Sequence, residues 1–232
     1  METWRLAKNA EDGDAAAQFG LGMRRLLADG VEQSFLLAEQ WIRRAAEQGY
    51  AAAQLNLGIM YLRGEGVAQD DTLAVEWFQK AADQQFAEAE FDLGIMMFYG
   101  RGTEEDPKAG VNWFRKAAQQ GLAKAQYILG SIYENGEGVA EDRSEAVKWY
   151  RRAAEKDFAV AQSSLAAMYT SGDGIMKDYA IASMWLHLAS ENGHRESAEQ
   201  LGELKNVMKP DQVIRGERLA KQWREEHAPP AQ

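Results

Sequence analysis

The sequence predicts an all-α fold, a right-handed α/α superhelical solenoid of about five to six helix-pair repeats of 36 residues with terminal capping helices. Three observations predict it. Tryptophan, glycine and leucine recur every 36 residues, the alanine-rich and proline-poor composition favours helices over sheet, and apolar residues follow helical spacing. A fixed period of this length indicates stacked units, because one helix pair cannot bury its apolar faces alone.

Four columns of residues keep the 36-residue step along the chain. They are Trp41, Trp77, Trp113, Trp149 and Trp185; Gly30, Gly66, Gly102, Gly138 and Gly174; Leu21, Leu57, Leu93, Leu129, Leu165 and Leu201; and Gly22, Gly58, Gly94 and Gly130, followed by Ala166 and Gly202. Because four independent columns share one step, the units are expected to be structurally equivalent.

Each repeat is predicted to contain a first helix, helix A, and a second helix, helix B. In the second repeat helix A covers residues 51–62 and helix B covers residues 72–84, where apolar residues recur at i, i+4 and i+8. The predicted organisation is a single solenoid over 1–227, with a cap helix at 3–10, repeats at about 14–49, 50–85, 86–121, 122–157 and 158–193, a partial repeat and C-terminal cap at 194–227, and a disordered tail at 228–232.

The two ends depart from the pattern. Trp4 and Leu6 lie on the first cap helix, with Trp4 one residue out of the tryptophan column. A sixth helix A is predicted at 195–207. Pro210 then opens a last helix, whose tryptophan, Trp223, is out of phase with the column. A helix that breaks the repeat is expected to cover the open end of the stack.

The stretch GEGVAQDD, residues 64–71, separates helix A from helix B. Glycine suits the left-handed residue that closes helix A, and Asp or Ser suits the residue that caps the first turn of helix B. Asp142, with Glu145 three residues later, predicts a reciprocal capping box. The cap column is Ser34, Asp70, Asp106, Asp142 and Asp178, with Pro107 as a favoured first helical residue. A phosphate site is disfavoured because the third glycine is missing and a carboxylate is present.

Small residues and tryptophans predict how the helices pack. Gly58 and its equivalents should let helix A approach helix B closely, and the tryptophans should fill the space between successive repeats. Alanines at the same step should do so from helix B: Ala45, Ala81, Ala117, Ala153 and Ala189.

Composition and charge exclude several classes of protein. The chain has no cysteine, which excludes disulfides and thiolate metal sites, and no run of 18 apolar residues. The net charge is −10, and because residues 195–232 hold equal numbers of acidic and basic side chains, the excess lies in residues 1–194. This charge disfavours nucleic acid and favours a basic partner. Without a visible signal peptide we expect a cytoplasmic protein, or a periplasmic one had a signal been removed.

The residues predict no catalytic, cofactor or metal site. The three histidines, His187, His194 and His227, form no recognisable triad or HExxH motif, and His187 is expected on a solvated helix face. Acidic loop residues are instead expected to form an acidic rim, a docking edge for a basic partner. The acidic rim comprises Glu65, Asp70, Asp71, Glu104, Glu105, Asp106, Glu137, Glu141 and Asp142.

A family resemblance is carried by the stretches AQYILGSIYENGEGVAED (125–142) and AVKWYRRAAEKD (146–157) and by their equivalents over about residues 10–207. In these stretches the chain resembles the Sel-one-like repeat (SLR) family, which is related to tetratricopeptide repeats. The resemblance implies an α/α solenoid that binds other proteins as an adaptor or scaffold. Some bacterial members are immunity proteins that neutralise a secreted toxin. A cysteine-rich subgroup is associated with penicillin binding, and this chain lacks those cysteines.

By analogy with tetratricopeptide repeats, the A helices should line an inner surface. The expected A-helix stripe is Phe19, Met23 and Leu26; Leu55, Ile59 and Leu62; Phe91, Ile95 and Phe98; Tyr127, Ser131 and Glu134; and Ser163, Ala167 and Thr170. The stripe is apolar in the first three repeats and polar in the last two. Its side chains could be exposed for a partner or packed as core, and both readings remain open at this point.

The sequence therefore predicts a non-enzymatic adaptor that binds a protein or peptide through the A helices and the acidic rim. The alternatives are an immunity protein and, less favoured, a β-lactam-recognising enzyme. Aromatic residues and arginines that could hold a carboxylate are the expected anchors. The predicted partner-binding residues are Phe19, Met23, Leu55, Ile59, Leu62, Arg63, Phe91, Ile95, Phe98, Tyr99, Tyr127, Glu134 and Asn135, with Arg101 near the edge.

Overall fold

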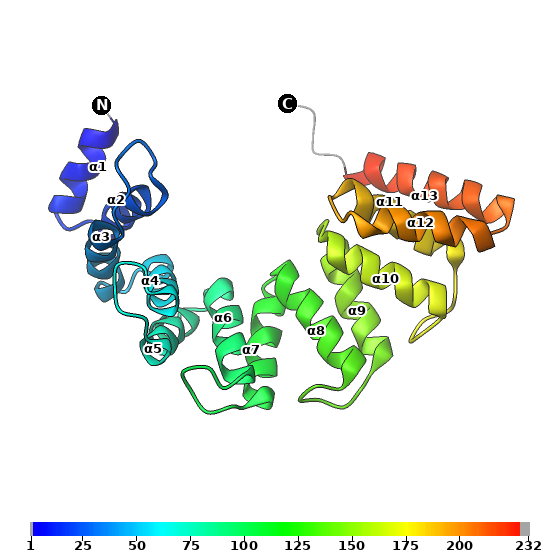
Figure 1. Cartoon of the computed structure of the whole chain (residues 1–232), viewed down its shortest axis with the longest axis horizontal. Helices are drawn as coiled ribbons and strands as arrows, with labels where there is room; N and C mark the ends of the chain where they lie inside the picture. Colours follow the sequence, from blue (N-terminus) through cyan, green and yellow to red (C-terminus); the bar gives the residue numbers. More distant parts are fainter. Residues whose placement is uncertain (1, 228–232) are drawn as a thin grey trace. The chain divides into compact units, whose positions relative to one another are not determined.

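The computed structural model describes residues 2–227, and all its regular secondary structure in this range is α-helical, which confirms the all-α repeat fold (Figure 1). The chain divides into two compact units, residues 1–120 and residues 121–232. Unit 1 holds α1 (Glu2–Glu11), α2 (Ala15–Leu27), α3 (Phe35–Glu47), α4 (Ala51–Arg63), α5 (Asp71–Ala82), α6 (Ala87–Phe98) and α7 (Pro107–Gln119). Unit 2 holds α8 (Ala123–Asn135), α9 (Arg143–Ala154), α10 (Ala159–Ser171), α11 (Tyr179–Glu191), α12 (Glu196–Val207) and α13 (Pro210–His227).

Close packing of helix A on helix B in the first four repeats depends on the helix-A glycine. A Cβ on Gly58 would lie 2.6 Å from the Phe78 ring, and one on Gly94 would lie 2.8 Å from the Phe114 ring. The predicted role of this column is thus confirmed. Its partners form a second column that directly follows the first four tryptophans, namely Ile42, Phe78, Phe114 and Tyr150.

The two glycines of each loop have different physical roles. Gly64 is left-handed, with a φ of 70°, and closes α4 as predicted. Gly66 is also left-handed, and a Cβ there would clash with the carbonyl group of Phe35, the first residue of α3. The second glycine therefore lets one repeat's loop contact helix B of the preceding repeat.

The predicted N-caps are confirmed in every repeat, as in Asp70, whose carboxylate accepts from the N–H groups of Thr72 and Leu73. The predicted capping box at Asp142 is only half formed. Its carboxylate accepts from the Glu145 N–H group, but its own N–H donates to the Tyr133 carbonyl, 2.8 Å away. The prediction that Glu145 bonds back is wrong, because the helix-A carbonyl already satisfies that donor.

The tryptophan column joins consecutive repeats, as predicted. Trp77 of α5 is buried and packs in one cluster with Ile42 of the preceding repeat and Leu57 of its own. A basic side chain three residues later covers each of the first four indole rings, an arrangement that adds cation–π attraction. These pairs are Trp41–Arg44, Trp77–Lys80, Trp113–Lys116 and Trp149–Arg152, with cation-to-centroid distances of 4.7, 3.9, 3.5 and 4.5 Å.

A buried polar column, absent from the sequence predictions, also links neighbouring repeats. Gln54 donates to the Ala46 carbonyl at the end of α3 and accepts from Gln84 in the turn after α5. The same position holds Gln18, Gln54, Glu90, Gln126 and Gln162. A buried amide with both ends satisfied fixes the spacing of three helices at once.

The chain ends differ in how well they cover the core. The predicted N-terminal cap helix α1 contacts α2, and Leu6 packs near Gly20, whereas Trp4 is 71% exposed. At the other end α13 packs on α11, and the Trp223 ring lies edge-on to Trp185 at 4.9 Å between centroids. The predicted C-terminal cap helix is therefore present, whereas the tail at 228–232 lies outside the described residues.

Candidate functional surfaces

Three members of the A-helix stripe in unit 1 are core residues. Leu55, Phe91 and Phe98 are only 8, 8 and 9% exposed. The Phe91 and Phe98 rings both pack against Phe114, at centroid distances of 5.5 and 6.0 Å. A charge placed at either phenylalanine would disrupt the fold, so these residues are unsuitable as probes of partner binding.

The other stripe residues of unit 1 are half-buried. Ile59 and Leu62 of α4 pack against the core cluster around Phe78, and Ile95 of α6 keeps part of its side chain in solvent. Phe19, Met23 and Leu26 of α2 have the same intermediate exposure against the cluster around Ile42. They form a partly apolar surface on each helix A.

The most accessible side chains of this surface lie at the C-terminal end of each helix A of unit 1, at its last residue or at its C-cap. Leu27 is 66% exposed and Tyr99 is 70% exposed, and the Arg63 side chain is 64% exposed. These three residues, 36 positions apart, are called the helix-end row. Arg63 and Tyr99 are among the residues predicted from the sequence, whereas Leu27 is not, although it stands 36 residues before Arg63.

Arginines near the surface are already paired. Arg63 lies 3.7 Å from Glu65, and Arg101 makes two hydrogen bonds, of 2.7 and 3.1 Å, to the carboxylate of Asp71, the first residue of α5 in the preceding repeat. The prediction that Arg101 is available for a partner's carboxylate is therefore wrong. The Arg101 guanidinium also lowers the pKa of Asp71.

Unit 2 contains the equivalent pair, between the first residue of a helix B and the next loop, with its charges exchanged. Arg143 stands 72 residues after Asp71 and lies 3.2 Å from Asp173, which stands 72 residues after Arg101. The pair at this position therefore connects the start of helix B to the loop of the following repeat, with the charges in either arrangement.

The acidic rim is only partly available to a partner. Asp70, Asp106 and Asp142 cap helices, and their carboxylates accept backbone hydrogen bonds. Three further members, Glu65, Asp71 and Glu141, are in ion pairs. Glu104, Glu105 and Glu137 are the exposed members outside those interactions, although Glu137 accepts from Asn135.

The predicted residues of α8 form a polar cluster in unit 2. The Tyr150 hydroxyl donates to Glu134 at 2.6 Å, and burial raises the pKa of Tyr150. Tyr127 is half-buried between the rings of Tyr150 and Phe158, at 5.7 and 5.6 Å. Asn135, at the end of α8, is exposed and remains accessible.

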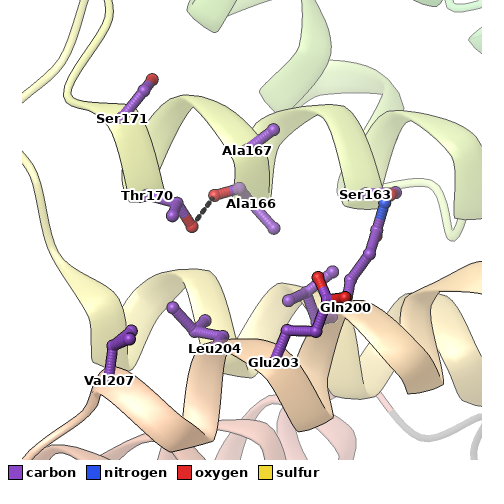
Figure 2. Close-up of a pocket in the computed structure, with 10 residues that line it drawn as sticks. Ser163, Ala166, Ala167, Thr170, Ser171, Gln200, Glu203, Leu204 and Val207 are labelled. Atoms are coloured by element: carbon purple, nitrogen blue, oxygen red, sulfur yellow. Dashed lines mark hydrogen bonds between the residues drawn. The ribbon is translucent and has the colours of Figure 1, made fainter.

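A cavity of about 410 Å³ opens between α10 and α12 in unit 2 (Figure 2). Its lining comes from Ser163, Ala166, Ala167, Thr170 and Ser171 on α10, Leu186 on α11, and Gln200, Glu203, Leu204 and Val207 on α12. The close-up shows the Gln200 side chain reaching toward Ser163, whose hydroxyl donates to it at 3.0 Å. The stripe positions of the fifth repeat thus lie beside an open cavity.

The histidines form no cluster with one another. His187 is half-buried, not solvated as predicted, and its Nε2 atom is buried without a hydrogen bond. Burial, together with the nearby Lys205, lowers the pKa of His187. His194 contacts Ser197, and His227 stacks on Trp223 at 3.9 Å.

Within residues 2–227 no group of three or more histidine or acidic side chains could hold a metal ion, and no helix is long and apolar enough to span a membrane.

The geometry defines a class of protein, an array of helix pairs whose A helices present a partly apolar surface. Residues 15–50, 51–86, 87–122, 123–158 and 159–194 each match the Sel1 repeat, so the chain belongs to the Sel1 repeat family. Proteins of this family generally mediate protein–protein interactions and typically act as non-enzymatic scaffolds. A search of curated proteins finds no match.

Solved structures share this architecture. A protective antigen of uropathogenic Escherichia coli, c5321, is 35% identical to this chain, with a TM-score of 0.85. The match covers 96% of this chain but 48% of the antigen, so this chain spans about half the length of the antigen. A Sel1 repeat protein from Oxalobacter formigenes is 33% identical over 95% of this chain and 88% of that one, with a TM-score of 0.77. An immunity protein from Pseudomonas aeruginosa shares the fold at 21% identity, with a TM-score of 0.54 over 91% and 80% of the two chains.

Proposed function

We propose that this protein is a non-enzymatic adaptor that binds a protein or peptide through the A-helix surface of unit 1. The helix-end row carries the proposal, since Leu27 and Tyr99 expose 66 and 70% of their surface at equivalent positions. Single exposed apolar residues are ordinary, but a periodic set beside half-buried Ile59 and Ile95 offers anchors of the kind that dominate interfaces.

The charge of the chain favours a basic partner. A net charge of −10, concentrated in residues 1–194, accelerates encounter with a cationic surface and repels nucleic acid. Two exposed members of the acidic rim, Glu104 and Glu105, cap no helix and contribute part of this negative charge. The proposed interaction therefore combines apolar anchors with long-range attraction that weakens as salt screens it.

A proteome capture experiment with matched variants tests this function. The full chain is immobilised, incubated with lysate of its source organism, and the retained proteins are identified by mass spectrometry. The double variant Leu27→Ser/Tyr99→Ser should lose a partner that wild type retains. The control Met176→Ser, which changes an 85% exposed residue of unit 2, should keep it. Retention by the double variant, with its helicity intact, would show that the helix-end row is not the binding surface.

An immunity protein is a narrower candidate. The acidic charge favours it, because inhibition of a cationic toxin needs a surface of opposite sign, and a neighbour of the same fold bears that name. Co-purification with a toxin encoded beside it, and loss of that toxin's activity in the complex, would support it. The non-enzymatic part of the proposal is tested by incubation with a β-lactam, after which the intact mass of the protein should be unchanged.

A further inference from the structure

The cavity between α10 and α12 exists because α10 carries small side chains at three stripe positions. Ser163, Ala167 and Thr170 stand where earlier repeats carry mostly larger residues. Those residues are Phe19, Leu55, Phe91 and Tyr127 at the first position; Met23, Ile59, Ile95 and Ser131 at the second; and Leu26, Leu62, Phe98 and Glu134 at the third. Protein interiors are close-packed, so space that earlier repeats fill with their own side chains stays open here.

The walls of the cavity are mainly apolar. Ala166, Leu186 and Leu204 line it as buried side chains, and Val207 at its edge is 64% exposed. The hydroxyl of Thr170 is occupied, because it donates to the Ala166 carbonyl at 2.9 Å within α10 (Figure 2). An apolar group that enters would remove this surface from water without breaking a hydrogen bond.

Gln200 and Glu203 are the polar residues that α12 contributes to the cavity. Gln200 uses its Oε1 atom to accept from Ser163 across the opening, and among the described residues no acceptor is recorded for its Nε2 atom. Glu203, the charged residue of the lining, makes no ion pair with another residue of the described range. A ligand here is therefore expected to offer a carbonyl group and a positive charge beside its apolar part.

We propose that this cavity receives one aromatic or leucine side chain from a segment of a partner protein, with a neighbouring lysine or arginine placed against Glu203. The inserted side chain replaces the volume that Phe91 or Tyr127 supplies in other repeats. The complementary charge argues for a basic segment over an acidic or neutral one. This proposal rests on the proposed adaptor function and adds a second contact, on unit 2, to the surface of unit 1.

Three blocked dipeptides serve as probes: N-acetyl-Phe-Lys-amide, N-acetyl-Phe-Glu-amide and N-acetyl-Ala-Lys-amide. Each is titrated into the isotope-labelled full chain at millimolar concentration, and backbone amide shifts are followed by NMR. The Phe-Lys probe should give saturable shifts at Ala167, Leu204 and Val207, severalfold tighter than the Phe-Glu probe. The Ala-Lys probe should give none.

Matched variants locate the effect. Ala167→Ile places in the cavity the residue that stands at Ile59 and Ile95, and should abolish saturable binding. Ala198→Ile changes an exposed alanine of α12 outside the lining, and should leave binding unchanged. Glu203→Gln should reduce the preference for the Phe-Lys probe to near unity.

Three results would overturn the proposal. These are no saturable shift with the wild-type chain, equal binding by Ala167→Ile when its spectrum shows a folded chain, and shifts that lie outside the lining. Concentration-dependent self-association that Ala167→Ile removes would identify a second copy as the occupant, which also contradicts the proposal. If the Ala167→Ile chain binds no probe but still captures the partner through the helix-end row, the cavity inference fails while the adaptor function stands.

Discussion

Replacement of Glu90 by glutamine is expected to stabilise unit 1. Four other repeats carry glutamine here, and Gln54 shows why: its Nε2 atom donates to the Ala46 carbonyl at 3.1 Å while its Oε1 atom accepts from Gln84 at 2.7 Å. Glu90, which is 2% exposed, accepts from Gln120 at 2.8 Å, but an ionised carboxylate cannot donate. Glu90→Gln restores that donor and removes a buried charge.

The size and pH dependence of the gain follow from the same contacts. One net hydrogen bond contributes about 0.5–1.5 kcal/mol, so with the charge removed we expect a gain of about 1–2 kcal/mol near neutral pH. Burial raises the pKa of Glu90 above its ordinary value of 4.5, against the opposing effects of Gln120 and Lys116. As pH rises, Glu90 therefore ionises in the unfolded chain before it ionises in the native protein. The native protein loses stability between the ordinary pKa of Glu90 and its raised native pKa. The advantage of Glu90→Gln should therefore shrink toward about pH 4, where the native carboxyl is protonated.

Native-state hydrogen exchange of the α5 and α6 amides measures this local stability in the full chain without assuming that both units unfold together. The reciprocal variant Gln54→Glu is the matched control and should destabilise α3 and α4 by a similar amount. The reasoning is refuted if Glu90→Gln does not raise protection near neutral pH, or if its effect is the same at about pH 4.

Two further predictions test packing and burial. Gly94→Ala should lower the free energy of unfolding in urea by about 1–3 kcal/mol, because its Cβ would lie 2.8 Å from the Phe114 ring. The control Gly202→Ala has open space around the new methyl group and should be neutral or stabilising. Equal effects of the two substitutions would contradict the packing argument. Because the pKa of His187 is lowered in the native protein, its contribution to stability is complete above the ordinary pKa of about 6.5 and is lost below it, as pH falls through the lowered native pKa. Wild type should therefore lose more stability than His187→Gln between about pH 7 and 5. Parallel pH profiles of the two proteins would contradict the burial of a neutral imidazole.

The repeat itself was predictable because its causes are local and periodic. Asp70 caps the helix that follows it, Gly64 closes the helix before it, and Gly58 permits close approach of the two helices. The same residue type at each 36-residue step therefore predicts the same local structure in each repeat. The candidate surfaces were less predictable. Phe91 and Ile95 share a helix and a similar hydrophobicity, yet one ring is held against Phe114 while the other side chain is half-exposed.

The sequence by itself determined the helix pairs, their period, their caps and the family, because these follow from backbone conformation and from the size of residues at fixed spacing. Only the tertiary structure decided which side chains remain free. Asp71 pairs with an arginine 30 residues away, and the cavity beside Ala167 depends on how α10 and α12 lie. Both depend on contacts between different repeats, and a residue's own spacing does not specify what the neighbouring repeat places against it.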